Sequence, residues 1–199
     1  KFVGDAVMAL FGGGEVTAEQ AATSAVRAAL LMQAELERLN RHAGKLGALQ
    51  MGVGIHFGPA VRGLIGSAQH RSYTALGDTV NMASRMEGMT RLLGASVLIS
   101  GDVLSKLEPG RFVLRALGLY APKGAARPLE CFDVHGERDL VGWSDEFRAE
   151  LDASQRAAEL TVGGNFQDAR IELEKALQLA AKSPREAGYR LRLASIARG

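Results

Sequence analysis

The sequence predicts an α+β protein with a largely antiparallel sheet, flanking helices and a helical tail at its C-terminal end. Short segments of alternating apolar and polar residues are separated by turn residues and interrupted by two long amphipathic segments. Strands and helices alternate irregularly and several strand pairs are joined by short turns, which favours hairpins over parallel βαβ units. Because the composition changes near residue 136, we expect a domain over residues 1–136 and a helical tail over residues 137–199.

The first part of the chain is expected to contain two strand pairs and a long helix. Four short segments are typical of strands: residues 2–3, 6–11, 50–57 and 60–65. A Gly-Asp turn joins the first two, and a Gly-Pro turn is expected to return the fourth strand along the third. Thr17 and Gln20 form a capping box, which predicts a helix from there to about Asn40.

A polar stretch over residues 66–72 follows, and Asp78 then opens a second long helix that reaches about Leu93. The rest of the domain is expected to contain strands over residues 96–99, 112–120 and 129–134, and a short helix over residues 101–107. The last two strands are expected to close the sheet as a hairpin.

The tail has a helical pattern over about residues 144–197, with breaks at residues 163–164 and 183–184. Residues 164–184 resemble a single tetratricopeptide unit. One such repeat cannot bury its own apolar face. We therefore favour a helical hairpin that packs on the domain or on a protein partner, with the tetratricopeptide interpretation as the alternative.

The composition is that of a globular protein, with 47% hydrophobic and 23% charged residues and a mean hydropathy of zero. A net charge of +2 gives no argument for nucleic acid or an anionic membrane, and no apolar run is long enough to span a bilayer. The single cysteine, Cys131, excludes an intrachain disulfide, so we expect a reducing, cytoplasmic location. The four histidines show neither metal-ligand spacing nor a matching nucleophile.

The first candidate site residue is Asp5, in the Gly-Asp turn between two short strands. An exposed carboxylate close to the backbone suits a hard divalent cation such as Mg²⁺. Gly-Asp is also among the commonest hairpin turns. On this segment alone, an ordinary turn is the favoured interpretation.

The second candidate is the pair Asn81 and Arg85, which lie one turn apart and project from one face of the expected helix. Asparagine forms neutral bidentate hydrogen bonds, and arginine offers a fixed fork for phosphate oxygens. The pair stands near a helix N-terminus, which favours anions. A solvated helix face without a ligand is the alternative.

Three motifs, in this order, resemble the catalytic domain of bacterial class III adenylyl cyclases, and the resemblance runs from residue 1 to about residue 134. The motifs are Lys-x-x-Gly-Asp-Ala-Val-Met-Ala-x-Phe-Gly, Gly-Ile-His-Phe-Gly-Pro-Ala-Val-x-Gly-x-Ile-Gly and Tyr-Thr-x-x-Gly-Asp-Thr-Val-Asn-x-Ala-Ser-Arg-Met-Glu. Their order and spacing make the resemblance specific. It implies a ferredoxin-like domain with flanking helices.

The resemblance also implies a role for each matching residue. Asp5 would be one of two aspartates that hold two Mg²⁺ (or Mn²⁺) ions. Lys1 and Thr74 would read the adenine ring. Asn81 would orient the ribose, and Arg85 would stabilise charge on the triphosphate in the transition state.

Lys123, in the turn before the last strand, would be a second phosphate-binding lysine. The implied reaction closes ATP to cyclic AMP by two-metal catalysis and releases pyrophosphate.

Family sites form between two domains, so a homodimer would combine Asp5 of one chain with the substrate residues of the other. The first metal aspartate normally precedes Lys1, and the chain begins without Met in a strand. We therefore expect an N-terminally truncated piece that is nearly inactive alone.

Three alternatives are open. A guanylyl cyclase would have acidic and small residues in place of Lys1 and Thr74. A degenerate regulatory domain would bind nucleotide without turnover, although Asp5, Asn81 and Arg85 are all present. A pure interaction protein, working through its helical tail, would leave the three motifs unexplained.

Overall fold

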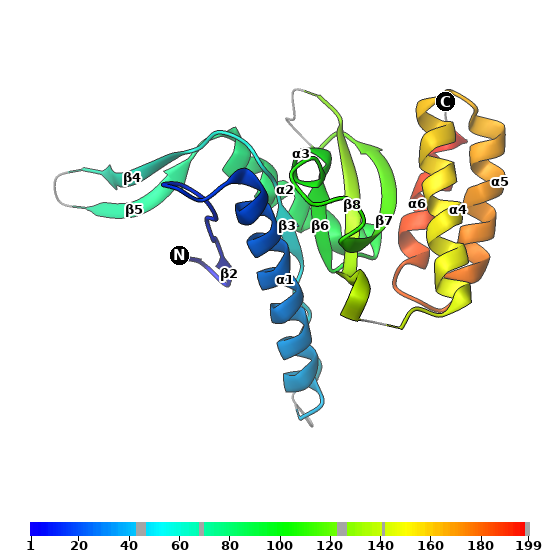
Figure 1. Ribbon diagram of the computed structural model, residues 1–199, viewed down its shortest axis with the longest axis horizontal. Coiled ribbons are helices and arrows are strands. Elements are labelled where there is room, and N and C mark those ends of the chain that lie inside the picture. Colours follow the sequence, from blue (N-terminus) through cyan, green and yellow to red (C-terminus); the bar gives the residue numbers. More distant parts are fainter. Residues whose placement is uncertain (43–46, 68–69, 123–126, 141, 198–199) are drawn as a thin grey trace.

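The computed structural model describes residues 1–42, 47–67, 70–122, 127–140 and 142–197. A four-stranded sheet lies in the middle of the molecule, with a long helix against each face and three tail helices beside one edge (Figure 1). Two small β-hairpins lie on the side away from the tail (Figure 1). Among the described helices, none has both the length and the apolar character that crossing a membrane requires.

The central sheet has the strand order β3-β6-β8-β7, formed by Val53–Ile55, Val97–Ser100, Leu129–Glu137 and Phe112–Tyr120. β6 pairs with β8, and β8 with β7, in antiparallel fashion, whereas β3 pairs with β6 in parallel. The expected return of residues 60–65 along residues 50–57 is therefore wrong. All four residues of β6 are buried, so this strand lies inside the sheet with a neighbour on each side. One neighbour is β8, and the other is β3.

The remaining strands form two separate antiparallel hairpins. β1 (Phe2–Val3) pairs with β2 (Ala6–Val7) around the expected Gly-Asp turn. β4 (Val61–Gly66), expected as a strand, pairs along its whole length with β5 (Arg71–Leu76), which was not predicted as a strand. Most residues of this second ribbon are exposed, so it lacks the alternation that identifies a half-buried strand.

α1 (Ala18–Asn40) covers one face of the sheet and begins at the expected capping box. The Gln20 amide N–H donates to Thr17 Oγ1 at 3.1 Å, and the Thr17 amide N–H donates to Gln20 Oε1 at 3.0 Å. The small apolar residues of the helix pack against alternate residues of β6, with Ala22, Val26 and Ala29 in one cluster with Val97 and Ile99.

α2 (Asp78–Leu93) covers the opposite face. Its apolar side packs against Leu98 of β6 and Cys131 of β8 through Met82, Met86 and Leu93. Because neighbouring residues of β6 point to opposite faces, this one strand carries both packing layers. Cys131 is free and fully buried, and burial raises the pKa of its thiol to about 12.

α3 (Gly101–Leu104) and a short 3₁₀ turn, η2 (Arg138–Leu140), complete the first part of the chain. The tail consists of α4 (Asp145–Val162), α5 (Phe166–Leu179) and α6 (Glu186–Ile196). These helices pack on one another around fully buried side chains, among them Ala157, Leu173 and Tyr189.

The tail covers the edge of the sheet at β7, along which α4 lies (Figure 1). The Ala116 carbonyl of β7 accepts two hydrogen bonds from the tail, from Ser154 Oγ at 2.6 Å and from Arg192 Nη1 at 3.0 Å. Ser154 and Arg192 are themselves buried. The tail therefore satisfies a backbone acceptor that an edge strand would otherwise expose.

Gly77 forms the bend between β5 and α2. Its φ of 147° and ψ of 164° lie in a region that is essentially restricted to glycine. α2 begins there without a side-chain cap. The backbone freedom of Gly77 therefore sets the start of the helix that carries Asn81 and Arg85.

Replacing Gly77 by alanine is expected to destabilise the protein by about 1–3 kcal/mol, because an alanine is strained in this conformation. Gly88→Ala is the matched control, since Gly88 lies inside α2 with nothing within 4 Å of an added Cβ. Alanine there is expected to be neutral or stabilising by up to about 1 kcal/mol. Urea unfolding measures both variants, and equal stabilities would contradict the expected strain.

Candidate active site

A strand, a bend and a helix N-terminus carry three of the expected site residues on one short segment. Thr74 lies on β5 opposite Gly63 of β4 and is half-buried. After the bend, Asn81 and Arg85 follow one turn apart on α2, with Asn81 exposed and Arg85 half-buried. Their spacing on one helix face agrees with the sequence-based expectation.

Lys1 reaches this segment from the far end of the sequence. Its Nζ donates a hydrogen bond to Ser72 Oγ at 2.9 Å. Ser72 and Thr74 are two residues apart on β5, so their side chains point to the same face of the strand. Lys1 therefore lies beside the strand face that carries Thr74.

Arg85 has a buried nitrogen that is not satisfied within the protein. Its Nη1 has no hydrogen-bond partner among the described residues. Leaving a buried donor unpaired costs about 1–3 kcal/mol, and more when the group is charged. Of the described residues that the sequence singles out, only Arg85 carries such an atom. An anionic oxygen would satisfy it.

Asp5 is exposed at the turn of the β1–β2 hairpin. Within the described ranges, no three His, Cys, Asp or Glu side chains are grouped so that they could hold a metal ion. Mg²⁺ is commonly held by one or two carboxylates together with substrate phosphates, so a single exposed carboxylate fits part of such a site. Lys123 lies outside the described residues.

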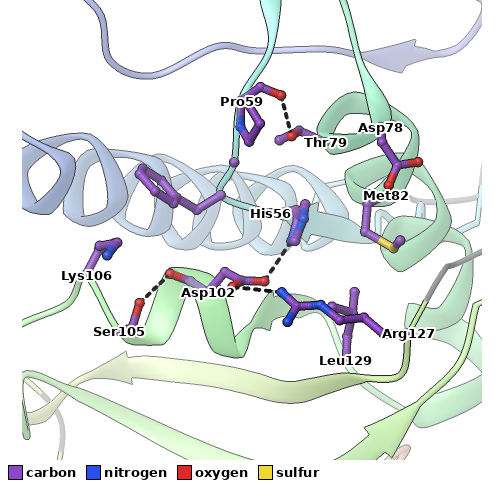
Figure 2. Close-up of a pocket in the computed structure, with 12 residues that line it drawn as sticks. His56, Pro59, Asp78, Thr79, Met82, Asp102, Ser105, Lys106, Arg127 and Leu129 are labelled. Atoms are coloured by element: carbon purple, nitrogen blue, oxygen red, sulfur yellow. Dashed lines mark hydrogen bonds and ion pairs between the residues drawn. The ribbon is translucent and has the colours of Figure 1, made fainter.

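A cleft of about 640 Å³ opens where β3 ends and where α2 and α3 begin (Figure 2). Asp102 lies between two basic side chains on its wall, with Oδ2 3.9 Å from His56 Nδ1 and Oδ1 3.7 Å from Arg127 Nη2. On the opposite wall, Thr79 Oγ1 donates to the Pro59 carbonyl at 2.6 Å. The five described residues singled out by the sequence do not line this cleft.

Burial lowers the pKa of His56 below its ordinary value, although the carboxylates of Asp102 and Asp78 act in the opposite direction. A neutral imidazole is therefore expected near pH 7, with Nδ1 2.9 Å from Ser100 Oγ. Ser100 is fully buried, and its hydroxyl also caps α3 at the Val103 amide. This hydroxyl is not accessible as a nucleophile, so the pair is structural.

His56 was not a predicted site residue, because the histidines show neither metal-ligand spacing nor a matching nucleophile in the sequence. The parallel pairing of β3 with β6 ends both strands at one edge of the sheet, which brings His56 beside Ser100 and Asp102. Because residues 50–57 were expected to pair with residues 60–65, the sequence did not predict that His56 lies beside Ser100 and Asp102. The available signal was the pair of polar residues, Ser100 and Asp102, at and just beyond the end of a buried strand.

Comparison with known proteins identifies the first part of the chain. Residues 1–136 match the family described as "Adenylate and Guanylate cyclase catalytic domain". Adenylate cyclase 1 of Rhizobium meliloti (strain 1021) is 38% identical over 138 residues, which cover 68% of this chain and 20% of that protein. The chain therefore spans about a fifth of the length of this curated relative.

Solved cyclase structures share the fold. The adenylyl cyclase CyaB from P. aeruginosa has a TM-score of 0.62 and 31% identity, covering 71% of this chain and 73% of that chain. The guanylyl cyclase Cya2 has a TM-score of 0.53 and 29% identity, covering 66% of each chain. The mixed α/β fold with antiparallel-rich sheets agrees with these structures, and the family match covers more than half of the sequence. The chain therefore belongs to the class III nucleotidyl cyclases.

Proposed function

We propose that the protein is an adenylate cyclase that converts ATP into cyclic AMP and pyrophosphate. The observation that carries this proposal is the buried Nη1 of Arg85, which no described residue partners and which lies on the same helix face as Asn81. A phosphate oxygen is an acceptor of the right charge for this nitrogen. Without a nucleotide, the unpaired nitrogen of Arg85 lowers the stability of the protein. A bound triphosphate would supply the missing hydrogen-bond acceptor.

In the proposed reaction, the ribose 3′-oxygen forms a bond to the α-phosphorus of the same nucleotide. The bond from this phosphorus to the oxygen that bridges to the β-phosphorus breaks, pyrophosphate leaves with the electron pair, and the hydroxyl proton passes to solvent. The protein contributes position and charge. Asn81 orients the ribose, and Arg85 stabilises the negative charge that shifts onto the leaving phosphates, with Lys123 proposed as a second donor.

Lys1 and Thr74 are proposed to read the base. Their placement along one face of β5 supports this, because the two side chains can then address neighbouring atoms of one planar ring. Lysine only donates hydrogen bonds, whereas a threonine hydroxyl both donates and accepts. Adenine presents a ring-nitrogen acceptor beside an amino donor, and this pair of groups suits the two side chains.

Asp5 is proposed to hold the metal ions. When bound, two Mg²⁺ or Mn²⁺ ions supply positive charge at the phosphates and a more acidic 3′-hydroxyl. The task of Asp5 is to offer exposed carboxylate oxygens at the tip of a tight turn, where a phosphate-bound ion can approach them. The proposed mechanism does not require a histidine base.

A homodimer is proposed to complete the site. The site residues lie outside the cleft, on an open part of a single chain. The two hairpins that carry Lys1, Asp5 and Thr74 also bear exposed apolar side chains, among them Phe2 at 82% and Val61 at 72% exposure. Exposed apolar surface of this kind is typical of subunit contacts. A second chain packed there would bring Asp5 of one copy to the substrate residues of the other.

The organisation around this site is also a proposal. We assign residues 1–136 to a ferredoxin-like catalytic domain and residues 137–199 to a tetratricopeptide-like tail that can contact a protein partner. A cytoplasmic location is proposed because ATP and a reducing environment are both found there.

The assignment of Arg85 is tested by Arg85→Ala, measured as cyclic AMP formation in the protein that carries this chain. Loss of one transition-state charge donor is expected to lower kcat about 10²–10³-fold. Arg91→Ala is the matched control, because Arg91 is exposed on the same helix, and it is expected to keep its activity. A loss of only two- to threefold in a folded Arg85 variant would refute the assignment.

The assignment of Asp5 is tested by Asp5→Asn with Mg²⁺ and Mn²⁺ titrations. Removing the charged ligand is expected to abolish metal-dependent cyclisation. The free energy of unfolding is expected to change by no more than about 0.5 kcal/mol, because the turn is exposed. Asp152→Asn, an exposed change on α4, is the control. Cyclisation that persists in a chelator would argue against a metal at Asp5.

Base selection is tested by comparing kcat/KM for ATP and GTP. ATP is expected to be preferred by at least about tenfold, since a wrongly matched buried polar group costs about 1–3 kcal/mol. Lys1→Glu combined with Thr74→Cys is expected to erode or reverse this preference. Lys175→Glu, an exposed change on α5, is expected to leave it unchanged. Equal or better cyclisation of GTP by the unmodified protein would show that Lys1 does not select adenine.

A further inference from the structure

The C-terminal end of α2 is held by a buried arginine. Arg115 of β7 has no exposed surface, and its Nη2 donates to the Leu93 carbonyl at 3.2 Å and to the Gly94 carbonyl at 3.0 Å. These are among the last carbonyls of a helix, which have no partner within it. The same nitrogen donates to Asp133 Oδ2 of β8 at 2.9 Å. Arg115 thereby ties the end of α2 to the sheet.

The tail closes over this arginine. Arg115 Nη1 donates to the Arg185 carbonyl at 3.3 Å, and the guanidinium carbon lies 5.3 Å from the centre of the Tyr189 ring. The Arg185 side chain is fixed in turn by Glu150 of α4, with Nε 2.7 Å from Oε1 and Nη2 2.9 Å from Oε2. Glu150 is buried and also accepts from the Tyr189 hydroxyl at 3.1 Å.

Backbone packing at the same place leaves no space for a side chain. Gly188 of α6 lies so close to the end of α2 that an added Cβ would overlap the Leu93 carbonyl oxygen. A Cβ on Gly94, which ends α2 with φ +57°, would overlap the Pro184 carbonyl of the tail. The tail therefore fits the end of α2 through backbone atoms, which cannot move as side chains do.

We propose that the helical tail is a positioning element of the catalytic half-site, acting through α2. The inference rests on the proposed function of Asn81 and Arg85. Asn81 stands in the first turn of α2 and Arg85 at its middle, whereas Arg115 of β7 and Gly188 of the tail hold the C-terminal end. The sheet and the tail together thus set the direction of the helix axis.

The length of the helix makes its direction important. At 1.5 Å per residue, Asn81 lies roughly 20 Å along the axis from Gly94. A tilt of about 3° at the clamped end then moves the far end by about 1 Å, and a misplacement of this size costs about 10²-fold in rate in well-aligned active sites. At the N-terminal end, Thr79 Oγ1 holds the helix to the Pro59 carbonyl, which belongs to a connecting segment outside the sheet.

The first test compares Gly188→Ala with Gly163→Ala in the full chain, by hydrogen exchange of the α2 amides without nucleotide. Gly163 is a tail glycine where an added Cβ makes only ordinary contacts, at 3.5 Å from the Glu159 carbonyl oxygen. Gly188→Ala is expected to speed exchange at least tenfold along α2, including the turn of Asn81 and Arg85, while Gly163→Ala leaves it unchanged. Equal exchange in the two variants would overturn the proposal, as would a change confined to the last turn of α2.

A second pair of variants tests the same contact without changing a glycine, in case Gly188→Ala does not fold. Glu150→Gln weakens the hold on Arg185, and Glu174→Gln is its control, because Glu174 pairs with Arg170 on the exposed side of α5. Glu150→Gln is expected to speed α2 exchange in the same way, and unchanged exchange in a folded Glu150→Gln protein would overturn the proposal.

Steady-state kinetics of the same substitutions, made in the protein that carries this chain, separates positioning from general loss of structure. Gly188→Ala and Glu150→Gln are each expected to lower kcat by about 10- to 100-fold with KM within twofold, because nucleotide binding is retained while alignment is lost. Faster exchange of α2 with the kcat of the controls would overturn the positioning role. If the protein that carries this chain forms no cyclic nucleotide at all, the proposed function fails, and the exchange comparison still decides whether the tail positions α2.

Discussion

A guanidinium without exposed surface must find its hydrogen-bond acceptors inside the protein, because an unpaired buried charge is strongly destabilising. Arg115 meets this requirement with acceptors from the sheet, from the end of α2 and from the tail. These three parts are distant in the sequence, so none of them satisfies the arginine alone. The position of each therefore depends on the other two, and α2 is held between the sheet and the tail.

Arg115 beside α2 and Arg85 on α2 differ in how their buried nitrogens are satisfied. All three guanidinium nitrogens of Arg115 donate hydrogen bonds to acceptors of the protein itself. Arg85, on the helix that Arg115 anchors, has a buried nitrogen without a partner among the described residues. The first arrangement stabilises the fold. The second is a local cost in stability, which agrees with the ligand contact proposed for Arg85.

The sequence was sufficient wherever a feature depends on residues close together in the chain. The capping box at Thr17, the helix that places Asn81 and Arg85 on one face, and the closing hairpin are local, and the structure confirms them. Pairings between distant segments were not predictable. The parallel partner of β3 and the contact of Lys1 with Ser72 depend on the register of whole strands.

Buried charges were equally hidden from the sequence. Arg115 lies among apolar residues of a strand, where the sequence pattern does not distinguish a buried arginine from one that faces solvent. The contacts of the tail with β7 and α2 could not be read from the helical pattern either, because that pattern identifies an apolar face without identifying its partner. For Arg115 and for the tail helices alike, the sequence does not identify the helix or strand that packs against them.

The buried thiol of Cys131 has a practical consequence for chemical labelling. Alkylating reagents and peroxides react with the thiolate, and a thiol with a pKa of about 12 is almost entirely protonated at neutral pH. Since it is also the only cysteine of the chain, the folded protein behaves toward maleimides as if it had none. A cysteine introduced at a surface position can carry a fluorophore or spin label without prior removal of the native one, and modification of Cys131 itself reports that the sheet has opened.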